Sequence, residues 1–88
     1  MTTSPANRNY RCAIGEIAVN ITNAEQWHAL AVCLGRPELA YEGSWEAVSR
    51  AEADGPTAAV VEEMFSEDAA ASWAERLEAH DVPHKLIN

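Results

Sequence analysis

The sequence predicts an α+β fold in which a small β-hairpin, or a sheet built on it, packs against three to four helices. Apolar and polar residues alternate over Glu16–Ile21, which is the two-residue period of a strand with one solvated face. Two later segments place apolar residues at the i, i+3, i+4, i+7 spacing of a helix with one buried face. These residues are Trp27, Leu30, Ala31 and Leu34, and then Ala70, Trp73, Ala74 and Leu77.

Length and composition are typical of one small globular domain. The chain has 88 residues, of which 48% are apolar and 23% are charged. No apolar run approaches the ~20 residues of a membrane span, and the first residues lack the apolar core of a signal peptide. We therefore expect a flexible leader over residues 1–9, a single domain over residues 10–88, and a cytoplasmic location.

The charge of the chain argues against several classes of ligand. The net charge is -8, with only six Lys and Arg residues. This balance disfavours nucleic acid, an anionic membrane surface and a tightly held polyphosphate. Cys12 and Cys33 are too few for a disulfide scaffold or a metal knuckle, so we expect two free thiols.

The first part of the chain predicts a hairpin that leads into a helix. Tyr10–Ala13 is the expected first strand, Ile14-Gly15 the tight turn and Glu16–Ile21 the second strand. Asn23 is the expected N-cap of the helix, and Gln26 is expected to reach back to the amide of the cap.

The helix is expected to end at Gly35 in a left-handed conformation, and Pro37 prevents its continuation. A single helical turn is expected over Arg36–Ala40 and a short helix over Trp45–Glu52. A further helix begins at Pro56, with Asp54 or Gly55 as its cap.

The last third predicts two helices and a strand. Residues Ser66–Asp68 interrupt the helix that begins at Pro56. The carboxylates of Glu67 and Asp68 favour the positive N-terminal end of the next helix. That helix runs to about His80, and Lys85–Ile87 follows Pro83 as a last strand. The helix that begins at Pro56 carries an apolar stripe of Val60, Val61, Met64 and Phe65.

Reactive or metal-binding constellations are not expected in the chain. His80 and His84 are four residues apart, but Pro83 breaks the helix that would align them, so no metal site is predicted. His28 is read as a surface residue, and the carboxylate pairs Glu62-Glu63 and Glu67-Asp68 are read as solvated surface. The three tryptophans are read as core. They are Trp27, Trp45 and Trp73.

Three collinear segments resemble the small domain of family III CoA-transferases of the CaiB/BaiF type, which include 2-methylacyl-CoA racemases. They are Ala24–Trp27, Leu34–Ala40 and Trp73–Pro83, within a similarity that extends over Tyr10–Asn88. The resemblance implies a larger enzyme in which a large domain, absent here, supplies the catalytic Asp and most of the CoA site. It also implies a coenzyme A thioester as the substrate, with no cofactor held by this chain, and an interlinked homodimer as the parent assembly. The chain by itself would be a monomer or would self-associate.

In the family, the small domain closes over the acyl end of the substrate. The resemblance implies four substrate-covering residues, which are Gly15, Ile21, Thr22 and Asn23, and no catalytic residue. Many transferases carry a glycine-rich loop here, whereas Arg11–Gly15 contains one glycine. Racemases place a glutamate near Asn23, and an amide cannot abstract a proton, which argues against racemase chemistry unless Glu25 takes the role.

Three functions follow as hypotheses. The first is a non-catalytic small domain or fragment of a CoA-transferase-like enzyme, of the transferase or racemase branch. The second is a free-standing interaction module derived from that domain, which would expose the surface normally covered by the large domain. The third is an independent enzyme with Cys12 or Cys33 as its nucleophile.

Overall fold

The computed structural model describes residues 4–52 and 55–87 and shows an α+β fold, which confirms the predicted class. Its sheet is antiparallel, with the strand order β1-β2-β3. The strands are β1 (Asn7–Arg11), β2 (Glu16–Asn20) and β3 (His84–Ile87). The helices are α1 (Ala24–Cys33), the short 3-10 helix η1 (Pro37–Leu39), α2 (Ser44–Arg50), α3 (Pro56–Phe65) and α4 (Ala70–Ala79).

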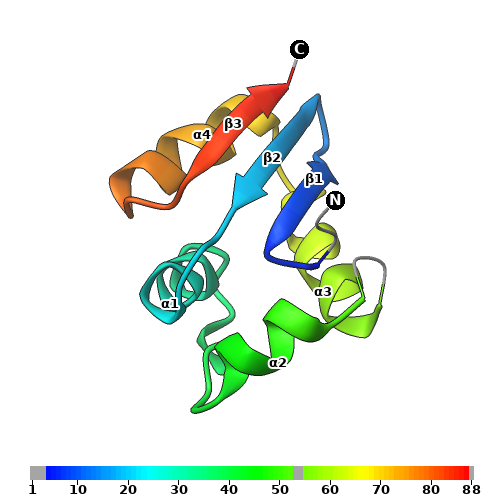
Figure 1. The fold of residues 1–88 in the computed structure, drawn as a ribbon. Coiled ribbons are helices and arrows are strands. Elements are labelled where there is room, and N and C mark those ends of the chain that lie inside the picture. The colour runs from blue at the N-terminus through cyan, green and yellow to red at the C-terminus, as the bar shows by residue number, and fades with distance from the viewer. Residues whose placement is uncertain (1–3, 53–54, 88) are drawn as a thin grey trace.

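The helices lie on one side and below one end of the sheet. Figure 1 shows α4 behind β2 and β3, and α3 on the β1 side, while α1 and α2 lie below the end at which β2 leaves the sheet. The register places Tyr10, Ile17 and Leu86 in one cross-strand row on the face toward the helices. The opposite face carries Ala18 and Lys85, which are also directly paired.

The hairpin begins earlier than the sequence predicts, so the boundary expected at Tyr10 is wrong. β1 starts at Asn7, and Ala6 before it is 1% exposed. The amide of Ile21 donates to the carbonyl oxygen of Ala6 at 2.8 Å, and the Tyr10 hydroxyl donates to the carbonyl oxygen of Pro5. These bonds hold residues 4–9 against the domain, where a flexible leader was expected. Residues 1–3 lie outside the described part of the chain.

The first helix is confirmed, with one correction to its cap. The Asn23 side-chain oxygen accepts from the Gln26 amide at 2.8 Å, as predicted. The Gln26 side chain, however, accepts from the amide and the hydroxyl of Thr22, at 2.8 Å and 2.9 Å, and not from the amide of Asn23. The Gln26 side chain thus closes the cap one residue earlier than the capping box predicts.

The end of α1 is a Schellman motif. Gly35 has a φ of +75°, and its amide donates to Val32 while the amide of Arg36 donates to Ala31, at 3.0 Å and 2.9 Å. The chain then turns through η1, as the single helical turn at Pro37 predicts. The indole of Trp27 donates to the carbonyl oxygen of Leu39 at 2.8 Å and thereby fixes η1 against α1.

The remaining helices follow the predicted order with shifted ends. α2 begins at Ser44 and ends at Arg50, two residues before the predicted Glu52. α3 begins at Pro56 with Gly55 at the N-cap position. The alternative cap, Asp54, lies outside the described residues.

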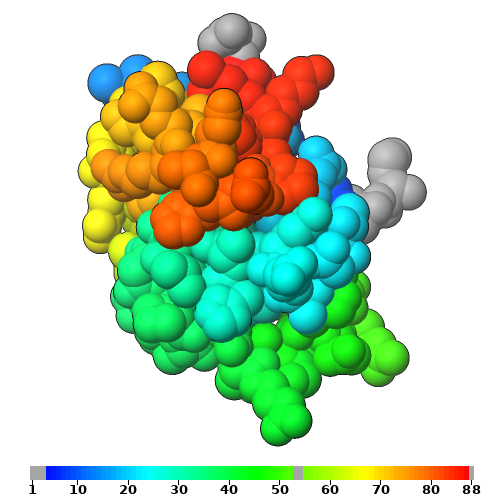
Figure 2. All heavy atoms as spheres, turned by 90° about the vertical axis from the view of Figure 1, so that its left-hand side faces the viewer, coloured from blue at the N-terminus to red at the C-terminus, as the bar shows by residue number. Residues whose placement is uncertain are grey.

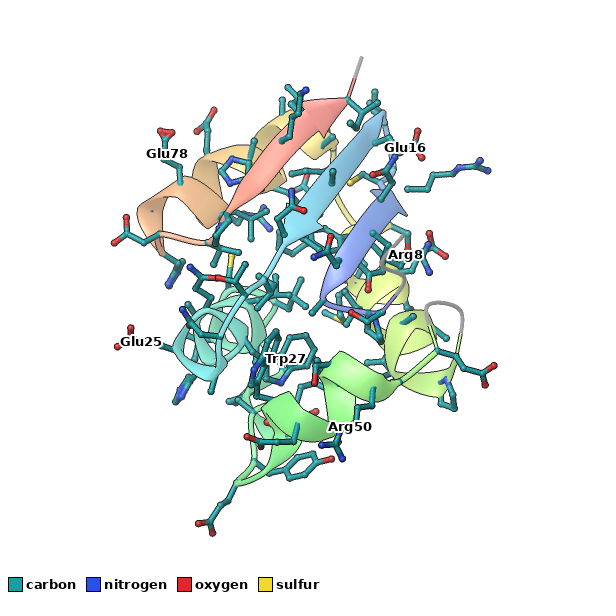
Figure 3. All side chains as sticks on the ribbon, in the orientation of Figure 1. Arg8, Glu16, Glu25, Trp27, Arg50 and Glu78 are labelled. Atoms are coloured by element: carbon teal, nitrogen blue, oxygen red, sulfur yellow. The ribbon has the colours of Figure 1, made fainter. Side chains whose placement is uncertain are left out.

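Two of the three tryptophans lie in the core, as predicted. Trp27 and Trp73 are each 3% exposed or less, whereas Trp45 is only half-buried at the margin of the core. Figure 3 shows Trp27 between α1 and α2. The largest fully buried side chains around these tryptophans are Tyr10, Phe65, Ile17, Leu30 and Leu77. Among the described residues, no helix is long and apolar enough to span a membrane.

Candidate functional site

The four residues that the resemblance implies for substrate covering lie at two opposite ends of β2. Gly15 lies in the hairpin turn before β2, and Ile21, Thr22 and Asn23 follow its other end. Gly15 and Ile21 flank this strand and are six residues apart, so a rise of ~3.4 Å per residue separates them by roughly 20 Å. The structure therefore does not bring the four residues together.

The end of β2 nearest α1 is already occupied by internal contacts. Ile21 is 2% exposed and belongs to the core. The polar side chains of Thr22 and Asn23 are exposed but form the cap of α1, so their hydrogen-bonding groups are engaged. This end presents a helix cap and offers few unsatisfied polar groups to a ligand.

The turn end is fixed to the connection between α3 and α4. The amide of Ala13 donates to the carbonyl oxygen of Asp68 at 2.9 Å, and the amide of Ala70 donates to that of Ile14 at 2.8 Å. These bonds form a short parallel bridge between the turn and the start of α4. The turn is therefore held in place, although the Ile14 side chain is 74% exposed.

Two shallow depressions meet at this turn. The first, which we call the hairpin groove, has a volume of about 490 Å³, and the second, the tip hollow, has a volume of about 420 Å³. They share Arg11, Cys12 and Glu16. The hairpin groove is otherwise lined by Arg8, Asn9, Glu62 and Ser66, and the tip hollow by Ala13, Gly15 and Ile87.

An ion pair forms one wall of the hairpin groove. The Arg8 guanidinium lies 3.2 Å from the Glu62 carboxylate and 4.3 Å from the centre of the Tyr10 ring. The same Glu62 oxygen accepts from the amide of Arg11 at 3.2 Å. Figure 3 shows Arg8 on the side of β1 that faces α3. Burial raises the pKa of Tyr10 strongly, with Arg8 opposing the shift and Glu62 adding to it, so this phenol stays protonated.

Sequence reasoning missed the residues of this groove. The sequence pattern places Glu62 on the solvated face of its helix and Arg8 in the leader. One signal was present in the sequence, because Arg8 and Tyr10 are two residues apart and lie on one face of a strand. The partner on α3 is 54 residues away from Arg8, which local patterns do not reveal.

The thiol in the groove lacks the environment of a nucleophile. Cys12 is a free thiol that is 6% exposed, and burial raises its pKa, with further increases from Glu16, Asp68 and Glu62. Burial likewise raises the pKa of the Cys33 thiol, and Arg76 opposes that shift. Reactive cysteines lie in electropositive surroundings that lower the thiol pKa, so these two are poor nucleophiles.

Metal-binding groups are not gathered within residues 4–52 and 55–87. No group of three His, Cys, Asp or Glu side chains in these ranges is arranged to hold an ion. The Nδ1 atom of His84 lies 2.8 Å from the carbonyl oxygen of Val82, next to the turn at Pro83. This contact uses one ring nitrogen of His84 within its own segment.

Comparison with known proteins gives one family and one group of solved structures. A statistical model of CoA-transferase family III matches residues 1–88. A crystal structure of Rv3272 from Mycobacterium tuberculosis, in its orthorhombic form, superposes with a TM-score of 0.78 at 24% identity over 98% of this chain and 24% of that chain. A second crystal structure of Rv3272, described as a hypothetical protein, gives a TM-score of 0.81 at 22% identity over 97% of this chain and 24% of that chain.

The chain thus spans about a quarter of the length of the solved chains that it matches. At these sequence identities the superposition establishes a common fold. No curated protein matches the chain significantly in sequence.

Proposed function

Because the chain belongs to CoA-transferase family III, we propose that it is the small domain of a CaiB/BaiF-type acyl-CoA transferase. In this role it covers the acyl end of a coenzyme A thioester that a separate large domain holds, and it supplies no reacting group. The observation that carries the proposal is the match of nearly the whole chain to only 24% of each solved relative. A unit that corresponds to a quarter of a longer chain is expected to contribute to a site rather than to contain one.

The chemistry of the groove supports a covering role. The hairpin groove and the tip hollow are both open to solvent, and the hairpin groove is mainly polar, unlike the enclosed apolar pockets that bury most of a small ligand. An open surface of this kind becomes a closed site only when another surface faces it. We therefore assign the covering role to the turn end of the hairpin, with Gly15 and Arg11, and not to Ile21–Asn23.

The rigidity of the turn is consistent with this assignment. Two backbone hydrogen bonds, from Ala13 to Asp68 and from Ala70 to Ile14, hold the turn on α4. A covering surface that is already in place loses little conformational entropy when it meets the substrate. In this proposal the domain closes as a body, and the turn itself does not fold over the ligand.

The racemase branch has weaker support. Its glutamate corresponds most nearly to Asn23, whose side-chain oxygen is engaged as the cap of α1. Glu25 follows in the first turn of that helix and points away from the body of the molecule in Figure 3. Neither side chain faces the hairpin groove, and a general base must lie within hydrogen-bond reach of the proton that it removes.

Incubation of the purified chain with an acyl-CoA and a labelled carboxylic acid tests the non-catalytic role. We expect no transfer of CoA to the labelled acid above the rate without protein. The same assay with Cys12→Ser and Cys33→Ser together removes direct attack of the thiols on the thioester. Transfer that persists in this double variant would refute the proposal and would favour an independent enzyme.

A further inference from the structure

The two edges of the sheet differ in their hydrogen bonding. β1 and β3 are the edge strands, because the strand order is β1-β2-β3. In an antiparallel sheet, every second residue of an edge strand directs its N–H and C=O groups away from the sheet, where another extended chain can pair with them. The use of these outward groups decides whether an edge is open or closed.

The edge of β1 is closed by two side chains. The register turns the backbone groups of Asn9 and Arg11 away from β2. The Arg8 Nε donates to the carbonyl oxygen of Asn9 at 2.8 Å, and the Glu62 carboxylate accepts from the amide of Arg11 at 3.2 Å. Arg8 and Glu62 thus engage two of the outward backbone groups that an added strand would use.

The edge of β3 is open. The amide of Asn20 donates to the carbonyl oxygen of Pro83 at 3.1 Å. In this register every second residue from Pro83 onward, Lys85 and Ile87, directs its backbone groups toward β2. The backbone groups of His84 and Leu86 therefore point away from β2. Within the described part of the chain no hydrogen-bond partner meets these backbone groups. Figure 2 shows β3, in red, at the surface beside α4.

Charge on β3 selects among the chains that could pair there. Lys85 is exposed and forms no ion pair with a described residue. Pairing with the β3 of a second copy, in the register that uses His84 and Leu86 of both chains, would place Lys85 directly opposite its own copy. Like charges that face each other across two strands are destabilising, whereas a carboxylate opposite Lys85 is favourable.

The other face of β3 favours an uncharged neighbour. His84 and Leu86 lie on the side of the sheet toward α4, and Leu86 is 38% exposed. Glu78 and Asp81 line a hollow next to His84 on this side. An acidic side chain placed here would be repelled by both carboxylates, whereas an apolar one would cover Leu86.

We propose that the β3 edge is a docking site for an extended polypeptide segment that adds as a fourth strand. The segment carries an acidic residue opposite Lys85, with an apolar residue on each side of it. Its backbone pairs with the outward groups of His84 and Leu86. The proposal rests on the sheet geometry and on the charges around β3, and it stands whether or not the chain is part of a transferase.

Titration of the ¹⁵N-labelled chain with two peptides, TVEVT and TVKVT, tests the proposal by NMR. We expect saturable shifts of the amides of residues 84–87 with both peptides at millimolar concentration. TVEVT should bind roughly two- to fivefold more tightly, which corresponds to a cross-strand charge pair. Shifts confined to β1, or no saturable shift at residues 84–87, would overturn the proposal.

Three variants sharpen this experiment. Leu86→Pro removes one outward N–H and should abolish binding, while Asn9→Pro makes the same change on the closed edge and should leave binding unchanged. Lys85→Glu should reverse the preference, so that TVKVT binds more tightly, and it remains decisive if Leu86→Pro does not fold. An unchanged preference in Lys85→Glu would contradict the proposal. Concentration-dependent shifts of residues 84–87 without peptide would also contradict it, since they indicate pairing between copies.

Discussion

Gly15 lies so close to Ala70 that a Cβ atom at position 15 would stand 3.3 Å from the Cβ of Ala70. Gly15 also has a φ of +85°, in the left-handed region that side chains disfavour. The turn of the hairpin and the start of α4 therefore meet through a residue without a side chain. This contact fixes the end of the hairpin to which we assign the covering role.

Gly15→Ala should destabilise the protein more than Gly43→Ala does. Both positions have a φ near +85°, so both variants incur the roughly 1–2 kcal/mol of left-handed strain. Nothing lies within 4 Å of a Cβ at position 43, whereas Ala70 must move at position 15. We expect an extra loss of about 1 kcal/mol for Gly15→Ala, measured by urea unfolding. Equal losses in the two variants would show that the turn does not press on α4.

The Arg8–Glu62 ion pair should contribute modestly to stability. Its side chains are 22% and 40% exposed, so solvent screens the attraction. A double-mutant cycle of Arg8→Met and Glu62→Gln, followed by thermal unfolding, should give a coupling energy of about 1 kcal/mol or less. The same variants of the Arg36–Glu38 pair serve as the control, because that pair is more exposed. A larger coupling for Arg36–Glu38 would contradict this account.

Trp27→Phe should cost more stability than Trp45→Phe. The buried Trp27 indole donates to the carbonyl oxygen of Leu39 at 2.8 Å, and phenylalanine would leave that oxygen without this donor. We expect Trp27→Phe to lower the free energy of unfolding by about 1–3 kcal/mol. Trp45→Phe should lower it by less than about 1 kcal/mol, because Trp45 is half-buried. Differential scanning calorimetry provides the comparison. A larger loss of stability in Trp45→Phe would mean that α1 is stabilised mainly by α2 and not by η1.

Cys12 should react with iodoacetamide more slowly than Cys33 at pH 8. Both thiols have a raised pKa, but Cys12 is more buried and faces carboxylates, whereas Arg76 acts on Cys33. Mass spectrometry of the alkylated chain should show at least a roughly tenfold difference in rate, which unfolding in urea abolishes. Faster labelling of Cys12 would place the thiol in a different environment.

The raised thiol pKa values also contribute to the dependence of stability on pH in the alkaline range. In the folded protein the thiols keep their protons at a pH where those of the unfolded chain are lost. Their contribution is fully present below the ordinary thiol pKa of about 8.5 and decreases as the pH rises above it. Replacement of Cys12 by Ala should flatten this alkaline decrease in the free energy of unfolding. An unchanged slope would show that the thiol does not contribute to it.

Local patterns predicted the helices well because their signals lie within one turn. The cap at Asn23, the left-handed Gly35 and the start at Pro56 each follow from a few neighbouring residues. The contact of Gln26 with Thr22 instead of Asn23 is a detail that the spacing of the capping pattern does not define.

The sheet edges and the groove were beyond local patterns. The early start of β1 depends on hydrogen bonds from Tyr10 and Ile21 back to residues 5 and 6, which composition near the start of the chain does not indicate. The groove depends on Glu62, whose carboxylate meets β1 across a long sequence separation. Such pairings become visible only when the strands and α3 are placed in space.

NMR mapping of acyl-CoA binding to the isolated chain is the most direct test of the central claim. Titration of the ¹⁵N-labelled chain with a short-chain acyl-CoA at millimolar concentration, with free CoA as the control, reports which end of the hairpin meets the ligand. The account predicts shifts that depend on the acyl group at residues 11–16 and none at residues 21–26. Shifts that depend on the acyl group at residues 21–26 in place of residues 11–16 would contradict it.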